Sequence, residues 1–189
     1  MKKLLTLSIA VLAFAACAKE SSNVPPAPAA EAAAVAAPAP APAVAGTPVE
    51  EQVSLTSEYS FPELNGGEDY VVKTDSSKPV LVATMAGFCG YCKRMIPHID
   101  ELAGKYKGQN VDVIIAFVDQ TNDELKNLEP VKAIKNVPVY YKSADFGQAM
   151  GLQGFPTMYL IHNGKAIQKW VGFDPDYVGY ISQEIDKIK

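Results

Sequence analysis

Runs of consecutive apolar residues alternate along the chain with segments in which apolar residues recur every third or fourth position. Residues 80–85 are almost continuously apolar and residues 111–119 largely so, which is typical of strands buried on both faces of a parallel sheet. Between these runs, the spacing of apolar residues across 95–106 predicts an amphipathic helix over 90–107. The chain therefore contains a predicted strand–helix–strand unit.

Two hairpins are predicted on either side of this unit. Residues 158–162 and 166–171 are apolar and are separated by an Asn-Gly pair at 163–164, a strong signal for a two-residue turn. Nearer the N-terminus, an Asn-Gly-Gly sequence at 65–67 precedes a short strand-like segment at 70–72. Asparagine and glycine accept the positive φ that such turns require, so we expect both turns to join antiparallel strands.

Short helical and extended pieces fill the segment between the second strand and the later hairpin. Residues 122–128 and 145–150 have helical character, and residues 137–141 are extended. At the C-terminus, Asp174 is expected to cap a last helix that has Pro175 at its first position. Parallel strands joined by helices and followed by an antiparallel pair predict an α/β fold with a mixed central sheet and helices on both faces.

The first residues have the pattern of an export signal. Lys2 and Lys3 precede an apolar run that is too short to cross a bilayer comfortably and that ends just before Cys17. Small residues before a cysteine resemble the lipobox of bacterial lipoproteins, which implies cleavage of residues 1–16 as a signal peptide and acylation of Cys17. An ordinary signal peptide cleaved at the same place is the alternative. Either interpretation puts the mature protein outside the cytoplasm, where disulfides persist.

Residues 17–51 predict a tether between the membrane and a folded domain. They consist mostly of alanine and proline, a low-complexity composition that cannot build a core. Repeated Ala-Pro favours polyproline II at ~3.1 Å per residue, so the tether could reach roughly 100 Å when fully extended. The composition becomes that of a globular domain over residues 52–189.

Net charge argues against a nucleic-acid-binding surface, and the cysteine count limits the disulfides that the domain can form. The formal net charge is −4 and the pI about 5.2, so the sequence predicts no surface for nucleic acid. Of the three cysteines, Cys17 lies in the signal region and only Cys89 and Cys92 lie in the expected domain. A framework of structural disulfides is therefore excluded from that domain.

Cys89 and Cys92 form a Cys-x-x-Cys pair between a predicted strand and a predicted helix, an arrangement typical of redox motifs. The first N–H groups of a helix have no intrahelical partner, and the helix dipole favours negative charge there. A thiolate at that position is stabilised and becomes a nucleophile at neutral pH. We therefore expect Cys89 to attack a disulfide, and Cys92, one turn further in, to resolve the mixed disulfide.

Three other uses of the cysteine pair stay open. The pair could be a local stabilising disulfide, or half of a zinc site, which would need two more ligands. It could also hold Cu(I), with Met85 or Met95 as a soft thioether ligand, although the sequence supplies no clear third ligand. We expect no metal and no cofactor, because exchange between thiols and disulfides needs neither.

Two separated motifs resemble the thioredoxin superfamily: Cys-Gly-Tyr-Cys at 89–92 and Phe-Pro-Thr at 155–157. Pro97, five residues past the second cysteine, matches the proline that kinks the family's helix. The extra sequence over 137–151 resembles the central insertion of TlpA-like extracytoplasmic thioredoxins, and the segment 61–72 resembles their leading hairpin. The resemblance implies a thioredoxin-like fold with these two additions.

The same resemblance implies the residues of a site. Pro156 would be cis and would lie beside the cysteines, leaving the backbone of Phe155 open to pair with a substrate strand. Gly90 and Tyr91, between the cysteines, would contact the substrate. Some positions depart from the family pattern, above all Ala83, which occupies the place of a buried acid that assists proton transfer at the resolving cysteine.

The sequence therefore predicts a lipid-anchored thiol–disulfide oxidoreductase that reduces disulfides of exported proteins through a mixed disulfide. It would work in the periplasm, and Ala18 after the acylated cysteine favours the outer membrane. A membrane or periplasmic redox partner would restore its thiols. The alternatives are a disulfide isomerase or oxidase, and a lipoprotein that carries copper or acts as a scaffold without catalysis.

Overall fold

The computed structural model describes residues 47–48 and 53–189. The predicted signal peptide, Cys17 and almost all of the predicted tether lie outside these residues. In the part of the chain that is described, no helix combines the length and the apolar character needed to cross a membrane.

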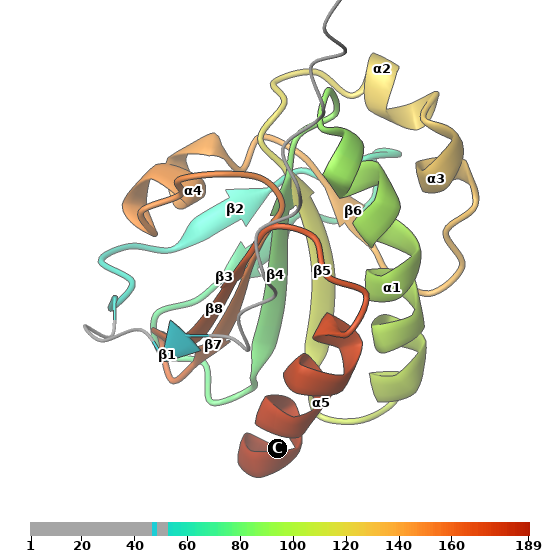
Figure 1. Cartoon of the computed structure of the whole chain (residues 1–189). Helices are drawn as coiled ribbons and strands as arrows, with labels where there is room; N and C mark the ends of the chain where they lie inside the picture. Colours follow the sequence, from blue (N-terminus) through green and yellow to red (C-terminus); the bar gives the residue numbers. More distant parts are fainter. Residues whose placement is uncertain (1–46, 49–52) are drawn as a thin grey trace, which may run out of the picture. The chain divides into compact units, whose positions relative to one another are not determined.

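A six-stranded mixed sheet forms the centre of the fold, in the strand order β1-β8-β7-β4-β5-β6 (Figure 1). Its strands are β1 (Thr47–Pro48), β4 (Val80–Met85), β5 (Asp112–Phe117), β6 (Val139–Tyr140), β7 (Thr157–His162) and β8 (Lys165–Val171). The strand β4 pairs in parallel with β5 on one side and antiparallel with β7 on the other. All six residues of β4 are buried, as the uninterrupted apolar run predicts.

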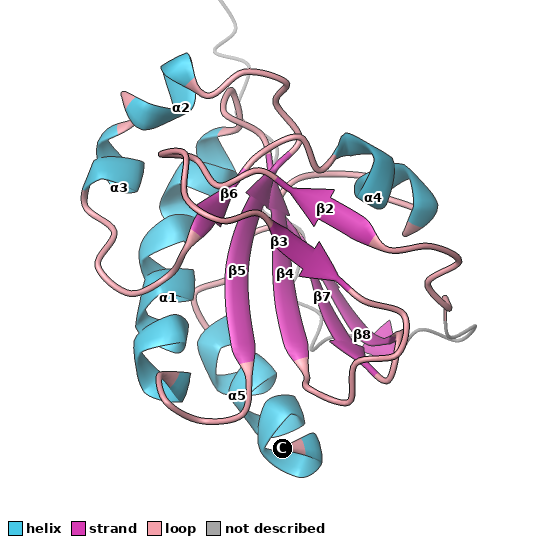
Figure 2. Cartoon of the chain, turned by 180° about the vertical axis from the view of Figure 1, so that it is seen from behind, coloured by secondary structure: helices cyan, strands magenta, loops and turns pink. Residues whose placement is uncertain are grey.

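Helices and a second small sheet cover the two faces (Figures 1 and 2). The helices α1 (Gly90–Tyr106) and α5 (Tyr177–Ile188) pack on one face, with inward residues such as Ile99 and Ile181 fully buried. The two-stranded sheet of β2 (Tyr59–Phe61) and β3 (Tyr70–Val72) covers the other face with α4 (Ala144–Ala149). The mixed sheet, the helices on both faces and the leading hairpin are confirmed.

Backbone segments pair with β6 on one border of the sheet and with β8 near the other. The backbone of residues 62–64 lies along β6, where Leu64 N–H donates to Val139 O at 2.9 Å and Tyr141 N–H donates to Pro62 O at 3.1 Å. On the opposite border, β1 pairs with β8 although its residues fall within the predicted tether. The difference arises because pairing at an edge uses backbone groups, and a proline is tolerated on an edge strand.

The start of the last helix differs from the expectation. The last helix begins at Tyr177 with Asp176 as its N-cap residue, two residues later than the sequence predicts. Asp174 instead accepts a hydrogen bond from Asp176 N–H at 2.8 Å, so its carboxylate closes a turn before the helix. The short helix predicted at 122–128 is α2 (Asp123–Lys126). The further helical turn expected after the interruption at Glu129-Pro130 is α3 (Glu129–Lys132), which has Pro130 in its first turn.

Candidate active site

The loop from β4 into α1 carries the Cys-x-x-Cys pair at the carboxyl end of the central strand. Cys89 N–H donates to Ala86 O at 3.0 Å, and Gly87 N–H donates to the Asp119 carboxylate at 2.9 Å. A Cβ atom on Gly87 would lie 2.8 Å from Leu125 Cδ2 and 3.0 Å from Asp119 Oδ1. Glycine is required here because the end of β5 and α2 approach the loop closely.

Cys89 is the N-cap residue of α1. Its backbone is extended (φ −80°, ψ 115°), and its sulfur accepts a hydrogen bond from Cys92 N–H at 3.2 Å. The sulfur therefore takes the place that an oxygen of Ser or Asp usually fills at a helix start, next to unpaired N–H groups. The side chain is partly exposed, which leaves Cys89 accessible to a second molecule.

Cys92 lies one turn into the helix and is fully buried in the core that α1 shares with the sheet. Burial raises the pKa of the Cys92 thiol, and its hydrogen bond with Cys89 raises that pKa further. Both cysteines are free thiols in this structure. The pair therefore combines an accessible sulfur with a protected, protonated one.

The Phe155–Pro156 peptide bond is cis, as the resemblance implies. The Cys89 thiol donates to the carbonyl oxygen of Phe155 at a sulfur–oxygen distance of 3.7 Å. Gly172 N–H donates to Pro156 O at 2.8 Å, and the Thr157 hydroxyl donates to Gly154 O at 2.8 Å. The two motifs are 66 residues apart in sequence, and the fold brings them into contact.

Aromatic side chains surround the accessible sulfur. Tyr91 is 47% exposed and Phe88 is 80% exposed, while Gly90 is exposed and Phe155 half-buried. The Phe88 ring meets the Phe155 ring edge-on at a centroid distance of 6.0 Å. All the residues that the sequence predicts for the site within the described chain therefore lie together.

Phe173 and Arg94 also belong to this surface, and sequence reasoning missed them. The Phe173 ring stacks on the Tyr91 ring at a centroid distance of 6.4 Å and an interplanar angle of 19°. The Arg94 guanidinium carbon lies 4.3 Å from the Phe173 centroid. The one signal in the sequence is an aromatic residue directly after Gly172, at the end of the strand that pairs with the segment after Pro156.

The core beneath the cysteines has no acid at position 83, where the thioredoxin pattern has a buried one. Ala83 on β4 lies opposite Ile115 on β5, and both are fully buried. The charge of the Asp119 carboxylate also raises the pKa of the Cys92 thiol, but it is one of the smaller causes of that shift. The proton of Cys92 therefore has no buried carboxyl at Ala83 to receive it.

The structure provides little for a metal at this site. Met85 and Met95, considered as thioether ligands, are both fully buried in the core. Among residues 47–48 and 53–189, no group of three or more His, Cys, Asp or Glu side chains is placed to hold a metal ion.

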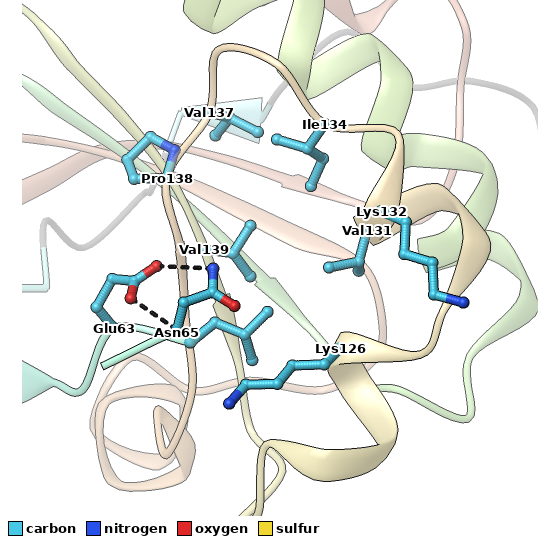
Figure 3. A pocket seen from close by; sticks show the side chains of 10 residues that line it. Glu63, Asn65, Lys126, Val131, Lys132, Ile134, Val137, Pro138 and Val139 are labelled. Atoms are coloured by element: carbon cyan, nitrogen blue, oxygen red, sulfur yellow. Dashed lines mark hydrogen bonds between the residues drawn. The ribbon is translucent and has the colours of Figure 1, made fainter. Parts of the chain in front are cut away.

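A separate cavity of about 340 Å³ lies against the β6 border of the sheet (Figure 3). It is lined by apolar side chains such as Val131 and Val139, with Lys126 and Lys132 at its side. Across from them, the Glu63 carboxylate accepts hydrogen bonds from the Asn65 backbone N–H at 2.6 Å and from the Asn65 side-chain amide at 3.4 Å. The residues that line this cavity include none of those around the cysteines.

A Cys-x-x-Cys pair at a helix start, facing a cis-proline that precedes an antiparallel strand, defines a thioredoxin-fold protein with a dithiol site. Comparison with known sequences agrees, since the thioredoxin family profile matches residues 67–143. Residues 67–143 therefore match the thioredoxin family, and the chain has a thioredoxin-like fold.

Curated relatives are disulfide isomerases and a bacterial oxidoreductase. A protein disulfide-isomerase of Drosophila melanogaster is 47% identical over 58 residues, which are 31% of this chain and 12% of that protein. The thiol-disulfide oxidoreductase ResA of Bacillus thuringiensis subsp. konkukian is 28% identical over 107 residues, covering 56% of this chain and 62% of the relative. The chain spans less than a quarter of the length of the first isomerases that it matches.

Solved structures share the fold over most of their length. The thiol:disulfide interchange protein DsbE of Chlorobium tepidum has a TM-score of 0.62 and 20% identity, covering 73% of this chain and 97% of that one. The exposed lipoprotein thioredoxin Etrx1 of Streptococcus pneumoniae has a TM-score of 0.59 and 23% identity, covering 69% and 99%. At these identities the likeness concerns the fold.

Proposed function

We propose that this protein is a thiol–disulfide oxidoreductase that reduces disulfides of exported proteins. The observation that carries the proposal is the position of the accessible Cys89 sulfur 3.7 Å from the Phe155 carbonyl, at the backbone edge before Pro156. A client strand that pairs with this edge would present its own disulfide to Cys89. Curated relatives that are oxidoreductases and isomerases support the same activity.

The reaction proceeds in two exchanges. The Cys89 thiolate attacks one sulfur of the client disulfide, that bond breaks, and the other client sulfur leaves as a thiolate that takes a proton from water. Cys92 then loses its proton and attacks the Cys89 sulfur, which forms the Cys89–Cys92 disulfide and releases the first client sulfur as a second thiol. The client gains two electrons and the protein loses two, so a redox partner outside the chain must reduce the pair again.

The N-terminal sequence supports a place of action outside the cytoplasm. Acylation of Cys17 would anchor the protein to the outer membrane, and the Ala/Pro-rich segment would hold the domain in the periplasm. The description of one structural relative as an exposed lipoprotein thioredoxin supports an anchored, extracytoplasmic protein. Labelling with a radioactive fatty acid, lost in Cys17→Ser, tests the anchor, and fractionation of the two membranes tests its place.

Disulfide isomerisation is the second candidate. It is favoured by the disulfide isomerases among the curated relatives, one of which is 47% identical over 58 residues. An isomerase must release its client after the first exchange and be kept reduced, whereas a reductase completes both exchanges. Equilibration of the Cys89–Cys92 pair with glutathione redox buffers measures the reduction potential, which lies near −270 mV for thioredoxin and near −180 mV for protein disulfide isomerase.

Reduction of insulin disulfides by the protein, Cys89→Ser and Cys92→Ser tests the activity itself. All three proteins should also carry Cys17→Ser, so that the unacylated thiol adds no background. We expect turnover only when both Cys89 and Cys92 are present. Wild-type turnover no higher than that of the two variants would refute the proposal, and stoichiometric copper bound by such an inactive protein would favour the copper carrier.

A further inference from the structure

The surface on the α1 side of Cys89 combines two aromatic rings with a cation. The rings of Tyr91 and Phe173 stack, and the Arg94 guanidinium carbon lies 4.3 Å from the Phe173 centroid and 5.8 Å from that of Tyr91. These contacts hold the flat guanidinium group in place beside the cysteine motif. The N–H donors along its edge suit a carboxylate, which a guanidinium binds through two parallel hydrogen bonds.

The charge on this surface has no partner. Lys93 and Arg94 directly follow Cys92, and neither forms an ion pair with a carboxylate in the described part of the chain. Arg94 is exposed and Lys93 is half-buried. Two cations directly after the Cys-x-x-Cys motif, without an ion pair among the described residues, give a local positive charge in a chain of net charge −4.

Exposed apolar side chains also lie near Cys89 and Pro156. Phe88 is 80% exposed, an unusual position for such a large apolar side chain, and its ring leans on Phe155. Val171, 47% exposed, lies across from Thr157 in the β7–β8 pairing and so borders the segment after Pro156. A client segment that docks at Cys89 therefore finds both apolar side chains and the Tyr91–Arg94–Phe173 surface close to the motif.

We propose that the site selects cysteines of client segments that carry both an acidic residue and an aromatic or large apolar residue close to the cysteine. The inference rests on the proposed exchange activity and adds its substrate class. The carboxylate would pair with the Arg94 guanidinium, and the apolar side chain would cover Phe88. Charge complementarity favours acidic segments over basic ones, because both unpaired cations lie within two residues of Cys92.

Reaction with activated peptides tests the preference. The protein carries Cys17→Ser and Cys92→Ser, so that Cys89 reacts once and the mixed disulfide accumulates. Each peptide has one cysteine joined to 2-thiopyridine, with phenylalanine on one side of it. The residue on the other side is glutamate, glutamine or lysine, and each peptide is also made with the two flanking residues exchanged. Cys89 attacks the peptide sulfur, and the thiopyridine leaves as thiopyridone with a proton from water. Intact mass after acid quenching gives the rate.

We expect the glutamate peptide, in one of the two orders, to react about fivefold faster than the lysine peptide, as one or two exposed ion pairs allow. Arg94→Glu should reverse the preference, and Arg94→Lys should keep most of it. Lys165→Glu, the same charge change at the far end of β8, should leave it unchanged. In 1 M salt, where the Debye length is about 3 Å, the preference should disappear.

Three results would overturn the inference. Equal rates for the three peptides in both orders would refute the charge preference while leaving the exchange activity intact. A preference that survives Arg94→Glu would refute the assigned surface. No mixed disulfide with any peptide would overturn the exchange activity together with the inference, and the two failures are therefore distinguishable.

Discussion

Ala83 and Ile115 lie directly opposite each other in the parallel pairing of β4 with β5, and both side chains are fully buried. The thioredoxin pattern has a buried acid at the first of these positions, and this chain has two apolar residues. Cys92 belongs to the same buried cluster and carries a thiol whose pKa is raised by burial. In the second exchange of the proposed reaction, no carboxyl at position 83 is therefore present to take the proton of Cys92.

A steep pH dependence of that second exchange is the first prediction. Because the raised pKa keeps Cys92 protonated, the thiolate fraction should increase about tenfold for each pH unit between pH 6 and 9. The rate of release of the second client thiol, measured with a saturating cyclic peptide disulfide, should follow this increase. A rate that levels off near pH 7 would show that another group accepts the proton.

Replacing Ala83 by aspartate tests the missing acid directly. A carboxyl buried in this core without a partner should lower the free energy of unfolding by about 2–4 kcal/mol. It should also accept the Cys92 proton, so that the second exchange becomes faster at pH 7 and less dependent on pH. Ala83→Asn is the matched control, with a similar cost in urea unfolding and no base. Identical pH profiles for the two variants would contradict the prediction.

Asp100 is predicted to stabilise the contact between α1 and the segment before β6. Its carboxylate accepts backbone N–H bonds from Lys135, Asn136 and Val137, the shortest at 2.7 Å. Burial alone would raise the pKa of Asp100, but these hydrogen bonds outweigh it and the pKa falls below its ordinary value of 3.8. Asp100→Asn should cost about 1 kcal/mol in urea unfolding, a modest value because solvent reaches the group.

The pH dependence of this contribution has a defined sign. A lowered pKa in the folded state means that the stabilisation is fully present above pH 3.8 and is lost as the pH falls further through the folded-state pKa. The difference in stability between wild type and Asp100→Asn should therefore shrink below about pH 4. Asp75→Asn, at an exposed position, is the control and should show no such convergence. A constant difference down to pH 2 would contradict the assignment.

Gly87→Ala should both destabilise the protein and slow the first exchange. The added methyl group would meet Leu125 Cδ2 at 2.8 Å and Asp119 Oδ1 at 3.0 Å, so the loop that carries Cys89 must shift. We expect a loss of about 1–3 kcal/mol in urea unfolding, as for other overpacked sites. Gly179→Ala, with open space around it in α5, should instead be neutral or slightly stabilising. Equal stabilities for the two variants would show that the loop has more room than its geometry indicates.

The sheet and the dithiol motif are predictable from the sequence because their signals are local. The apolar run of β4, the Asn-Gly turn at 163–164 and the Cys-x-x-Cys pair each lie within a few residues, and each reappears in the structure where it is expected. Pro156 is recognised for the same reason, since its neighbours form a short motif. Its contact with Cys89 needed the resemblance as well, because hydrophobic periodicity does not indicate which distant loops meet.

The misses involve contacts that no local pattern encodes. Arg94 and Phe173 lie 79 residues apart, and their contact depends on how α1 packs beside the end of β8. The strand β1 comes from a segment whose composition predicts a tether, because edge pairing places few demands on side chains. The later start of α5 has the same origin, since both Asp174 and Asp176 can act as an N-cap residue and only the surrounding contacts decide between them.

The backbone pairing along β6 and along part of β8 has a consequence for a protein that would handle unfolded chains. Residues 62–64 run along β6, and β1 runs along β8. Exposed strand borders recruit other extended polypeptides and promote aggregation. With these strands already paired, a client would bind at the turn before β7, beside the reactive sulfur. It would then dissociate after the exchange of its sulfurs, because it has not joined the sheet as a further strand.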